Sequence, residues 1–410
     1  MDPECVVHVP LLLSMDPTTG EGALGAVHDA AVALASGRVC WLGRSADAPD
    51  APDVRHVHGV ALPGLVDCHT HAVWAGSRAH EFLRRLEGVP YHQILEEGGG
   101  ILSTVSATAA ADEATLVQLA VERLRRLRAR GVTTVEVKSG YGLTPSAEAR
   151  MLRAAREAGR LAGVRVVTTF LGAHAVPARL RGDRAAYVDE VIHEQLPLCA
   201  PHADFIDAYV DRGAFTVDEG RQILTAGRAA GLGVRVHAEQ VAYTGAAAMA
   251  ARSGATSADH LERIDRDGIE AMATHGTIGV MLPGAMLYLR DTAPPVAALR
   301  EAGVRLAVAT DLNPGSSPVG CLLTCATLAA VTMGMTVDEV LLGITAVAAD
   351  VLARPQLGRL RVGGPGDVTV VELPPGEPAT TGALVQFLGA GFGPVHTWVG
   401  ADREGRVADA

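Results

Sequence analysis

The chain has 410 residues, of which 48% are hydrophobic, and its formal net charge is −11 at pH 7. This charge, without any long run of lysine and arginine, argues against a nucleic acid or an anionic membrane surface as partner and favours small molecules. Six cysteines without CxxC spacing, a Met-Asp-Pro-Glu start without a basic region, and the lack of an apolar run of roughly 20 residues predict a cytoplasmic chain with reduced thiols that does not span a membrane.

Short strands separated by turns are predicted near both ends of the chain, in residues 1–60 and 357–410. The predicted strands lie at 5–9, 31–34, 39–42, 367–372 and 396–399. Because the two ends share this pattern, we expect them to build one small β domain together.

Apolar strands alternate with helical stretches rich in alanine, leucine and arginine between residues 61 and 356, which is typical of repeated βα units and a parallel sheet. In the stretch 113–130, for example, leucines recur near helical spacing. The eight predicted strands are 61–68, 133–138, 165–171, 204–210, 233–237, 256–260, 277–282 and 305–310. We therefore predict an α/β fold, a closed TIM-like (β/α)8 barrel of residues 61–356 with a small β-sandwich domain built from both chain ends.

A pair of histidines, His69 and His71, stands where the first of these strands ends. Imidazoles at i and i+2 on an extended strand point to the same face, so both can hold one cation. Two exposed or hydrogen-bonded histidines would look identical in sequence, so the pair needs support from elsewhere in the chain.

That support comes from the ends of later strands, because the carboxyl ends of all strands in a parallel barrel open onto one face. Strand five ends in His237, strand six in His260, and strand eight is followed by Asp311. Three neutral imidazoles and a carboxylate suit Zn²⁺ or iron rather than Mg²⁺ or Ca²⁺. The sequence therefore predicts one such ion per subunit, with His69, His71, His237 and Asp311 as its ligands.

This order of residues resembles the amidohydrolase superfamily, whose members place His-x-His on strand one, histidines on strands five and six, and aspartate on strand eight. The resemblance covers the whole chain, including the split β domain. In that superfamily a lysine or glutamate at the end of strand four usually bridges two metal ions, whereas the segment 204–211 offers neither. One metal ion is therefore expected. Lys138 ends the second strand, where we expect it to pair with Glu136 or to contact the substrate.

Four segments resemble the imidazolonepropionase family, which opens the imidazolone ring in histidine degradation. They lie in loops at the predicted active face and cover 98–105, 136–143, 170–177 and 309–318. The resemblance implies a metal-dependent hydrolase that uses an activated water to open the cyclic amide bond of 4-imidazolone-5-propanoate. The product is N-formimidoyl-L-glutamate, in the third step of the pathway. A homodimer is also implied.

The same resemblance assigns residues to the substrate. Arg78 matches the family's carboxylate-binding arginine, which grips the propanoate tail bidentately. Tyr141 and His174 match positions that contact the ring or its opened product. Gln240 stands where some members carry glutamate; it can hydrogen-bond the ring but cannot take a proton.

A loop after strand eight matches the family's product-binding loop, through Asn313, Gly315 and Ser316. An amide, a backbone N–H and a hydroxyl there are suited to a carboxylate. Asn-Pro-Gly-Ser is also ordinary turn chemistry, so the alternative is a loop that only caps the strand.

The resulting hypothesis gives Asp311 and His260 catalytic roles. Metal binding activates a water molecule, which attacks the ring carbonyl. Asp311 accepts the water proton and passes it to the leaving ring nitrogen, and His260 orients the nucleophile or stabilises the developing oxyanion.

Two rival functions remain for this sequence. A nucleobase or other aminohydrolase deaminase would share the metal ligands, although a neutral base gives Arg78 no carboxylate to bind. A non-catalytic scaffold would keep the barrel for partner binding, and the presence of every predicted ligand argues against it.

Overall fold

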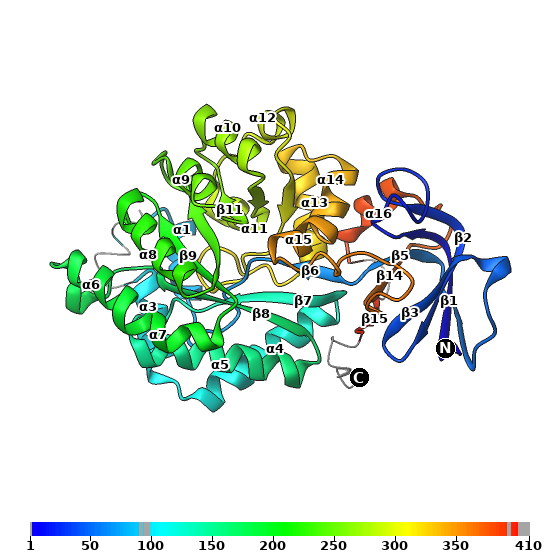
Figure 1. Ribbon diagram of the computed structural model, residues 1–410, viewed down its shortest axis with the longest axis horizontal. Coiled ribbons are helices and arrows are strands. Elements are labelled where there is room, and N and C mark those ends of the chain that lie inside the picture. Colours follow the sequence, from blue (N-terminus) through cyan, green and yellow to red (C-terminus); the bar gives the residue numbers. More distant parts are fainter. Residues whose placement is uncertain (1, 90–92, 94–98, 392–394, 401–410) are drawn as a thin grey trace.

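A computed structural model describes residues 2–89, 93, 99–391 and 395–400 of the chain. Two sheets organise it, one closed into a barrel and one that belongs to a smaller β-sandwich domain. The two lie side by side (Figure 1). Among the described residues, no helix combines the length and the apolar character needed to cross a lipid bilayer.

The barrel sheet has eight strands in sequence order, and every neighbouring pair is parallel. Its strands are β6 (Leu65–Asp67), β7 (Val132–Lys138), β8 (Arg165–Ala173), β9 (Phe205–Val210), β10 (Gly233–Ala238), β11 (Ser257–His260), β12 (Ile278–Met281) and β13 (Leu306–Val308). Backbone hydrogen bonds from Asp311 N to His69 O and from His71 N to Leu312 O join the segments that follow the first and last strands. The predicted (β/α)8 barrel is confirmed.

Helices surround the barrel and connect its strands (Figure 1). They are α1 (Ala79–Leu86), α3 (Ile101–Ala110), α4 (Glu113–Arg128), α5 (Pro145–Ala162), α6 (Arg184–Glu190), α7 (Leu196–Cys199), α8 (Val217–Ala229), α9 (Ala246–Arg252), α10 (Arg266–His275), α11 (Pro283–Leu289), α12 (Val296–Glu301), α13 (Leu322–Met333), α14 (Val337–Gly343) and α15 (Ala346–Val351). The predicted helix at 113–130 is α4, which begins where Asp112 accepts a hydrogen bond from Thr115 N and buries Leu116, Leu124 and Leu127 against the barrel.

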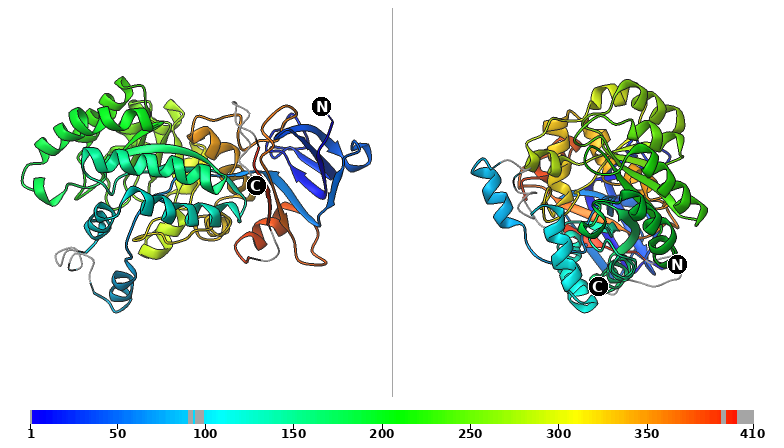
Figure 2. Two further views of the ribbon diagram at one scale, coloured as in Figure 1. Left: turned by 90° about the horizontal axis from the view of Figure 1, so that it is seen from below. Right: turned by 90° about the vertical axis from the view of Figure 1, so that its left-hand side faces the viewer.

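The β domain contains segments from both ends of the chain, as predicted. Its mixed sheet consists of β1 (Cys5–Leu13), β2 (Ala26–Ala35), β3 (Arg38–Arg44), β4 (Asp53–His56), β5 (Gly59–Pro63), β14 (Val368–Glu372) and β15 (Val395–Trp398). Figure 2 shows the N-terminal strands in blue beside the C-terminal segments in orange and red. Antiparallel pairing of β14 with β5 joins the two ends of the chain.

Two details differ from the sequence-based prediction. The strand expected at 61–68 is two strands, because β5 pairs in the small sheet and β6 in the barrel. Gly64 separates them, and a Cβ there would lie 2.3 Å from Thr133 Oγ1 and 2.8 Å from Asp367 Cβ, so the chain crosses between the domains through a gap that admits only glycine. The C-terminal fifty residues also hold a helix, α16 (Thr381–Leu388), whose apolar side of Leu384 and Leu388 packs into the core.

Candidate active site

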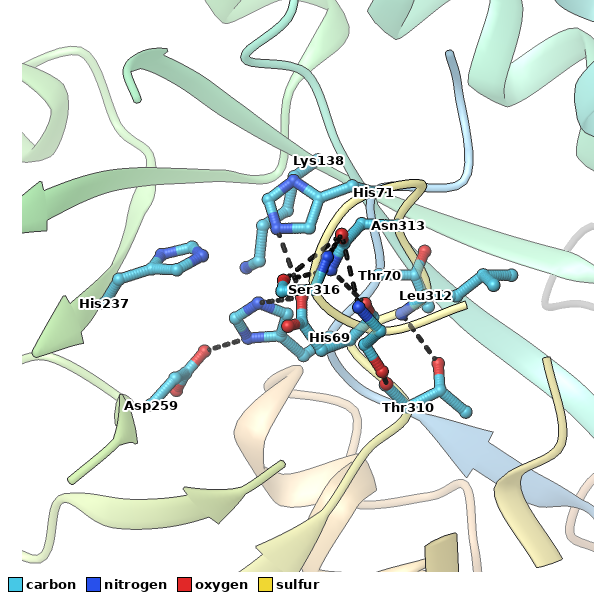
Figure 3. A network of polar contacts seen from close by, with 12 residues as sticks. His69, Thr70, His71, Lys138, His237, Asp259, Thr310, Leu312, Asn313 and Ser316 are labelled. Atoms are coloured by element: carbon cyan, nitrogen blue, oxygen red, sulfur yellow. Dashed lines mark hydrogen bonds and ion pairs between the residues drawn. The ribbon is translucent and has the colours of Figure 1, made fainter. Parts of the chain in front are cut away.

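The predicted metal ligands converge at the carboxyl ends of the barrel strands. Side-chain nitrogens of His69, His71 and His237 all lie within 4.8 Å of one another. Asp311 Oδ1 lies 3.5 Å from Nε2 of both His69 and His71. Figure 3 shows the three imidazoles facing a common space. The backbone bonds between the ends of β6 and β13 explain why residues so distant in sequence meet here.

Buried carboxylates orient two of these histidines. His69 Nδ1 donates to Asp259 Oδ2 at 2.6 Å, drawn as a dashed line in Figure 3. His237 Nδ1 lies 3.0 Å from Asp207 Oδ2. Since a carboxylate only accepts, each contact places the proton on Nδ1 and leaves Nε2 as a lone-pair donor.

The two carboxylates belong to a fully buried ion network. Lys138 Nζ lies 2.8 Å from Glu136 Oε1 and 2.9 Å from Asp207 Oδ2. Arg235 Nη2 lies 2.8 Å from Asp259 Oδ2, and its Nη1 is 3.0 Å from Glu136 Oε1. Buried charges need partners of this kind, and here the pairs hold the histidine-orienting groups in place. Of the two roles considered for Lys138, the ion pair with Glu136 is therefore the one observed.

The imidazoles are held neutral. Burial lowers the pKa of His69 well below its usual value, and neighbouring Lys138 adds to the effect. Burial and the nearby His174 do the same to the pKa of His71, and burial lowers the pKa of His237. Neutral imidazoles are the protonation state that binds metals.

Asp311 and His260 sit at the edge of this group in strained backbone. Their φ angles are 51° and 82°, a region that non-glycine residues rarely adopt and that tends to occur at functional sites. Burial raises the pKa of Asp311 to about 7. Burial also works to lower the pKa of His260, but Glu262 and Asp311 outweigh it and raise that pKa.

The residues present fit a zinc or iron ion. His69 Nε2 and His237 Nε2 are buried nitrogens without a hydrogen-bond partner, and His71 Nε2 lies 3.5 Å from the Asp311 carboxylate on the same side. Unpartnered buried nitrogens are costly unless another group occupies the space they face. Three imidazoles and a carboxylate match the donor preference of these ions. The group of His69, His71 and His237 can therefore hold a metal.

A cavity of about 1160 Å³ opens above this group. All seven residues that the sequence assigned to the substrate line it: Arg78, Tyr141, His174, Gln240, Asn313, Gly315 and Ser316. The predicted metal ligand His69 is fully buried and does not line the cavity. Gly98, at the start of one family-like segment, lies outside the described residues.

Arg78 is held in place by a buried glutamate. Its Nε and Nη2 donate to Glu81 Oε2 at 2.9 and 2.7 Å, and Glu81 Oε1 accepts from Gly100 N at 3.0 Å. The guanidinium also lies against the loop after β13, because a Cβ on Gly315 would be 1.9 Å from Arg78 Nη1. The predicted tail-binding arginine and the predicted product loop thus form one wall.

Tyr141 and His174 form the neighbouring wall. His174 stacks on His71 with ring centroids 5.0 Å apart, and the Tyr141 ring centroid is 5.3 Å from that of His174. His174 Nδ1 donates to Gly140 O at 3.0 Å, which leaves Nε2 as an acceptor. Burial lowers the pKa of His174 to about 3, so the ring is neutral.

The loop that carries Tyr141 is organised by Glu148, a residue of α5. Its carboxylate accepts hydrogen bonds from the backbone N–H groups of Gly140, Gly142 and Leu143 at 2.7–2.8 Å, and the side chain is fully buried. A carboxylate that accepts three N–H bonds acts as a rigid template for the backbone around it.

Gln240 lies in the cavity wall, where its Oε1 accepts from the hydroxyl of Tyr209 at 3.0 Å. Its neighbour Glu239 is buried and accepts from Gly245 N at 2.9 Å, away from the cavity lining. The two residues therefore point in different directions. Because β10 ends at Ala238 and Glu239 has a φ of 57°, a turn of the backbone, rather than strand alternation, separates them.

The loop after β13 is organised by the side chain of Asn313. Its Oδ1 accepts from the backbone N–H groups of Gly315 and Ser316, both at 2.8 Å, and its Nδ2 donates to Asp311 O at 2.7 Å (Figure 3). Asn313 therefore performs the turn chemistry that the sequence allowed, and the same bonds fix the backbone that follows Asp311.

Sequence reasoning missed five residues of the site: Glu81, Glu148, Asp207, Tyr209 and Asp259. Asp207 and Asp259 were detectable, because each lies within a predicted barrel strand, where an unpaired buried carboxylate is costly. Glu81 and Glu148 lie in helical segments, and nothing in their spacing separates them from ordinary surface glutamates.

Comparisons with known proteins agree with this architecture. Residues 60–407 match the model of the amidohydrolase family. A relative from Xanthomonas campestris pv. campestris, named imidazolonepropionase, is 46% identical over 400 residues, covering 96% of this chain and 97% of its own. Another of that name from Cupriavidus necator is 48% identical over 350 residues, covering 83% and 84%. Among solved structures, an adenosine deaminase from Xanthomonas campestris with bound zinc superposes with a TM-score of 0.70 at 16% identity, covering 97% and 92%.

Proposed function

This chain belongs to the amidohydrolase family and, within it, to the imidazolonepropionases, and we propose that it hydrolyses the ring amide bond of 4-imidazolone-5-propanoate to N-formimidoyl-L-glutamate, the third step of histidine degradation. One observation carries the proposal. Three neutral buried imidazoles and Asp311 meet at the floor of a cavity whose wall holds Arg78. This substrate requires a centre that cleaves an amide bond and, beside it, a positively charged side chain that binds its carboxylate.

His69, His71, His237 and Asp311 would hold one Zn²⁺ or iron ion per subunit. A bound ion of this kind acidifies water and polarises a carbonyl oxygen near neutral pH. Asp259 and Asp207 support the proposal because they keep Nε2 of His69 and His237 available.

The substrate is positioned by the walls of the cavity. Arg78 binds the propanoate tail, and the backbone N–H and hydroxyl groups around Gly315 and Ser316 lie next to it. The ring rests against Tyr141 and His174, and the neutral imidazole of His174 suits an uncharged ring. Gln240 offers its amide N–H₂, because its oxygen already accepts from Tyr209.

Two groups handle charge and protons. Hydrolysis forms a bond between the water oxygen and the ring carbonyl carbon and breaks the carbon–nitrogen bond, so one proton must move from water to the leaving nitrogen. Asp311 accepts that proton and delivers it. His260, whose pKa is raised by Glu262 and Asp311, donates toward the oxyanion that develops on the carbonyl. Gln240 takes no proton.

The direct test uses substrate generated in situ from urocanate. Purified protein of known metal content is incubated with it, and formation of N-formimidoyl-L-glutamate above the uncatalysed background is followed. Turnover that is lost on chelation and restored by metal supports the proposal. Ammonia release instead would indicate a deaminase, and protein that lacks both metal and turnover would indicate a scaffold.

Replacing Asp311 with asparagine tests the proton carrier. We expect Asp311→Asn to lower kcat by at least about 10³-fold, in the range that general acid–base groups supply, with metal still measurable by elemental analysis. Asp338→Asn, an exposed first-turn residue of α14, is the matched control and keeps wild-type activity. Near-normal turnover of Asp311→Asn with bound metal would contradict the assignment.

Assembly and location complete the proposal. The family resemblance supports a homodimer, which sedimentation equilibrium tests by a mass twice that of one chain.

The six cysteines are free thiols in the structure, which supports a reducing, cytoplasmic setting. Fractionation of the cells that express the chain tests the location.

A further inference from the structure

Arginines are concentrated in the wall of the active-site cavity. Among the residues that the structure describes, six arginines line it, whereas the acidic residues in the same wall are Asp291 and Asp311. Over the whole chain the balance is opposite, with 35 lysines and arginines against 46 aspartates and glutamates. A protein of net charge −11 repels anions at long range, so this local reversal of sign calls for a reason.

Three of these arginines already have partners. Arg78 pairs with Glu81, Arg184 with Glu219, and Arg85 donates to Gly315 O. In particular, the buried glutamate beside Arg78 offsets the charge of the side chain that binds the substrate tail. Glu219 does the same for Arg184, whereas Arg85 keeps its charge but is held against the loop by its bond to the Gly315 carbonyl.

The other three are Arg181, Arg212 and Arg290, and we call them the arginine collar. Each is exposed, lines the cavity, and makes no side-chain hydrogen bond or ion pair with any residue that the structure describes. They come from three separate connections, after β8, after β9 and at the end of α11. Because these connections follow the carboxyl ends of strands, the collar lies on the catalytic face.

We infer that the arginine collar attracts the anionic substrate to the cavity and so raises kcat/KM, without contacting the reacting atoms. This inference rests on the proposed function, since 4-imidazolone-5-propanoate is a carboxylate anion. Unpaired charges at the mouth of a cleft focus the field there and raise the local concentration of a ligand of opposite sign. The charge matters rather than its hydrogen-bond geometry, so lysine serves as well as arginine.

Ionic strength separates this effect from others, because the Debye length shrinks from about 30 Å at 0.01 M to about 3 Å at 1 M salt. We expect kcat/KM of the triple variant R181A/R212A/R290A to be about 5–10-fold below wild type at 20 mM ionic strength. This loss is near the lower end of the roughly 10–10³-fold gain in association rate that electrostatic steering provides. At 500 mM the two should agree within about twofold, since salt screens the collar. The loss falls on kcat/KM, and kcat at saturating substrate is unaffected.

Two further triples serve as controls. R181K/R212K/R290K keeps the charges, and we expect wild-type kcat/KM at every ionic strength. R125A/R160A/R252A removes three arginines from the last turns of α4, α5 and α9, at the opposite face of the barrel, and reaches the same net charge as the collar variant. It should behave as wild type. The inference is wrong if kcat/KM of the collar variant depends on ionic strength in the same way as that of wild type. It is also wrong if R125A/R160A/R252A loses as much kcat/KM as the collar variant.

Binding of glutarate provides a readout that does not depend on turnover. Calorimetric titration at 20 mM ionic strength should show weaker glutarate binding by the collar variant than by wild type, and the difference should vanish at 500 mM. If wild type binds glutarate more tightly than the collar variant at low salt but does not hydrolyse the imidazolone, the proposed function fails and the collar stands as a site that attracts carboxylate anions. If wild type turns over and neither measurement distinguishes the collar variant, the collar fails alone.

Discussion

Position 315 is a glycine whose missing side chain leaves room for the guanidinium of Arg78. No positive φ is involved, so the backbone would accept alanine, but a Cβ would stand 1.9 Å from Arg78 Nη1. The identity of this residue is therefore set by a neighbour more than 230 positions away in the chain. Gly315 and Arg78, the predicted product-loop and tail-binding residues, are therefore coupled by contact.

Gly315→Ala should displace Arg78 and weaken substrate binding. We expect KM to rise about tenfold or more, because a shifted bidentate contact to a carboxylate is worth roughly 1.5–3 kcal/mol, while kcat changes less. Steady-state kinetics measures this. Gly382→Ala, at a helical glycine with no atom within 4 Å of the added Cβ, is the control. An unchanged KM in Gly315→Ala would show that Arg78 does not bind the tail.

At the scale of elements, the connection between β7 and α5 shows how a helix builds a binding loop. Glu148 belongs to the first turn of α5 and reaches back to three backbone N–H groups of the preceding loop. Through Gly140, the same loop accepts the hydrogen bond that sets the tautomer of His174. The helix thus fixes the loop around Tyr141 and His174, the two side chains proposed to bind the ring, through backbone hydrogen bonds.

Glu148→Gln should loosen this loop. The amide has one acceptor oxygen and turns an N–H₂ group toward N–H donors, so we expect about 1–3 kcal/mol less stability from unsatisfied buried groups and a KM at least about fivefold higher. Urea unfolding and kinetics measure the two effects, and metal content should stay at the wild-type level. Glu157→Gln on the exposed face of α5 is the control. Wild-type KM in Glu148→Gln would contradict the template role.

A second element, α14, begins with a capping box that is reinforced by an arginine. Glu339 accepts from Thr336 N, Thr336 Oγ1 accepts from Glu339 N, and Arg300 forms a bidentate pair with the Glu339 carboxylate. Burial works to raise the pKa of Glu339, but Arg300 and Thr336 outweigh it and lower that pKa below 4.5.

Glu339→Gln should therefore destabilise the protein in a pH-dependent way. A carboxyl with a lowered folded pKa stabilises fully above its unfolded pKa, and the contribution is lost as pH falls through the folded pKa. We expect a cost of about 0.5–1.5 kcal/mol at pH 7, after allowance for the partly exposed pair. The difference in the free energy of unfolding between the variant and wild type should shrink below about pH 4.5. Urea midpoints at a series of pH values measure it, and a pH-independent difference would contradict the argument.

At the scale of the whole molecule, Asp367 joins the β domain to the barrel. Its carboxylate lies 2.8 Å from Arg165 Nη1 at the start of β8 and accepts from Gly400 N, and its backbone oxygen accepts from Gly64 N where the chain passes between the sheets. These contacts lie at the end of the barrel opposite the catalytic face.

Asp367→Ala should weaken the junction between the domains and spare the chemistry. We expect a loss of about 1–3 kcal/mol from a partly buried charge left without its partner, seen as a lower Tm and faster proteolysis near residues 64 and 367. The kcat should stay within about twofold of wild type. A protein with unchanged Tm and proteolysis would show that the contact does not hold the domains together.

Sequence patterns alone predict the barrel and bring together the residues of the candidate metal site. Regular alternation of strands and helices predicts parallel βα units, and the carboxyl ends of parallel strands must meet, so the strand order alone places His69, His237 and Asp311 together. The tertiary structure alone decided which buried groups face one another. Asp259 against His69, Glu148 against its loop, the division of the first strand at Gly64 and the arginine collar depend on strand register and helix packing, which bring together residues with no spacing relationship in the chain.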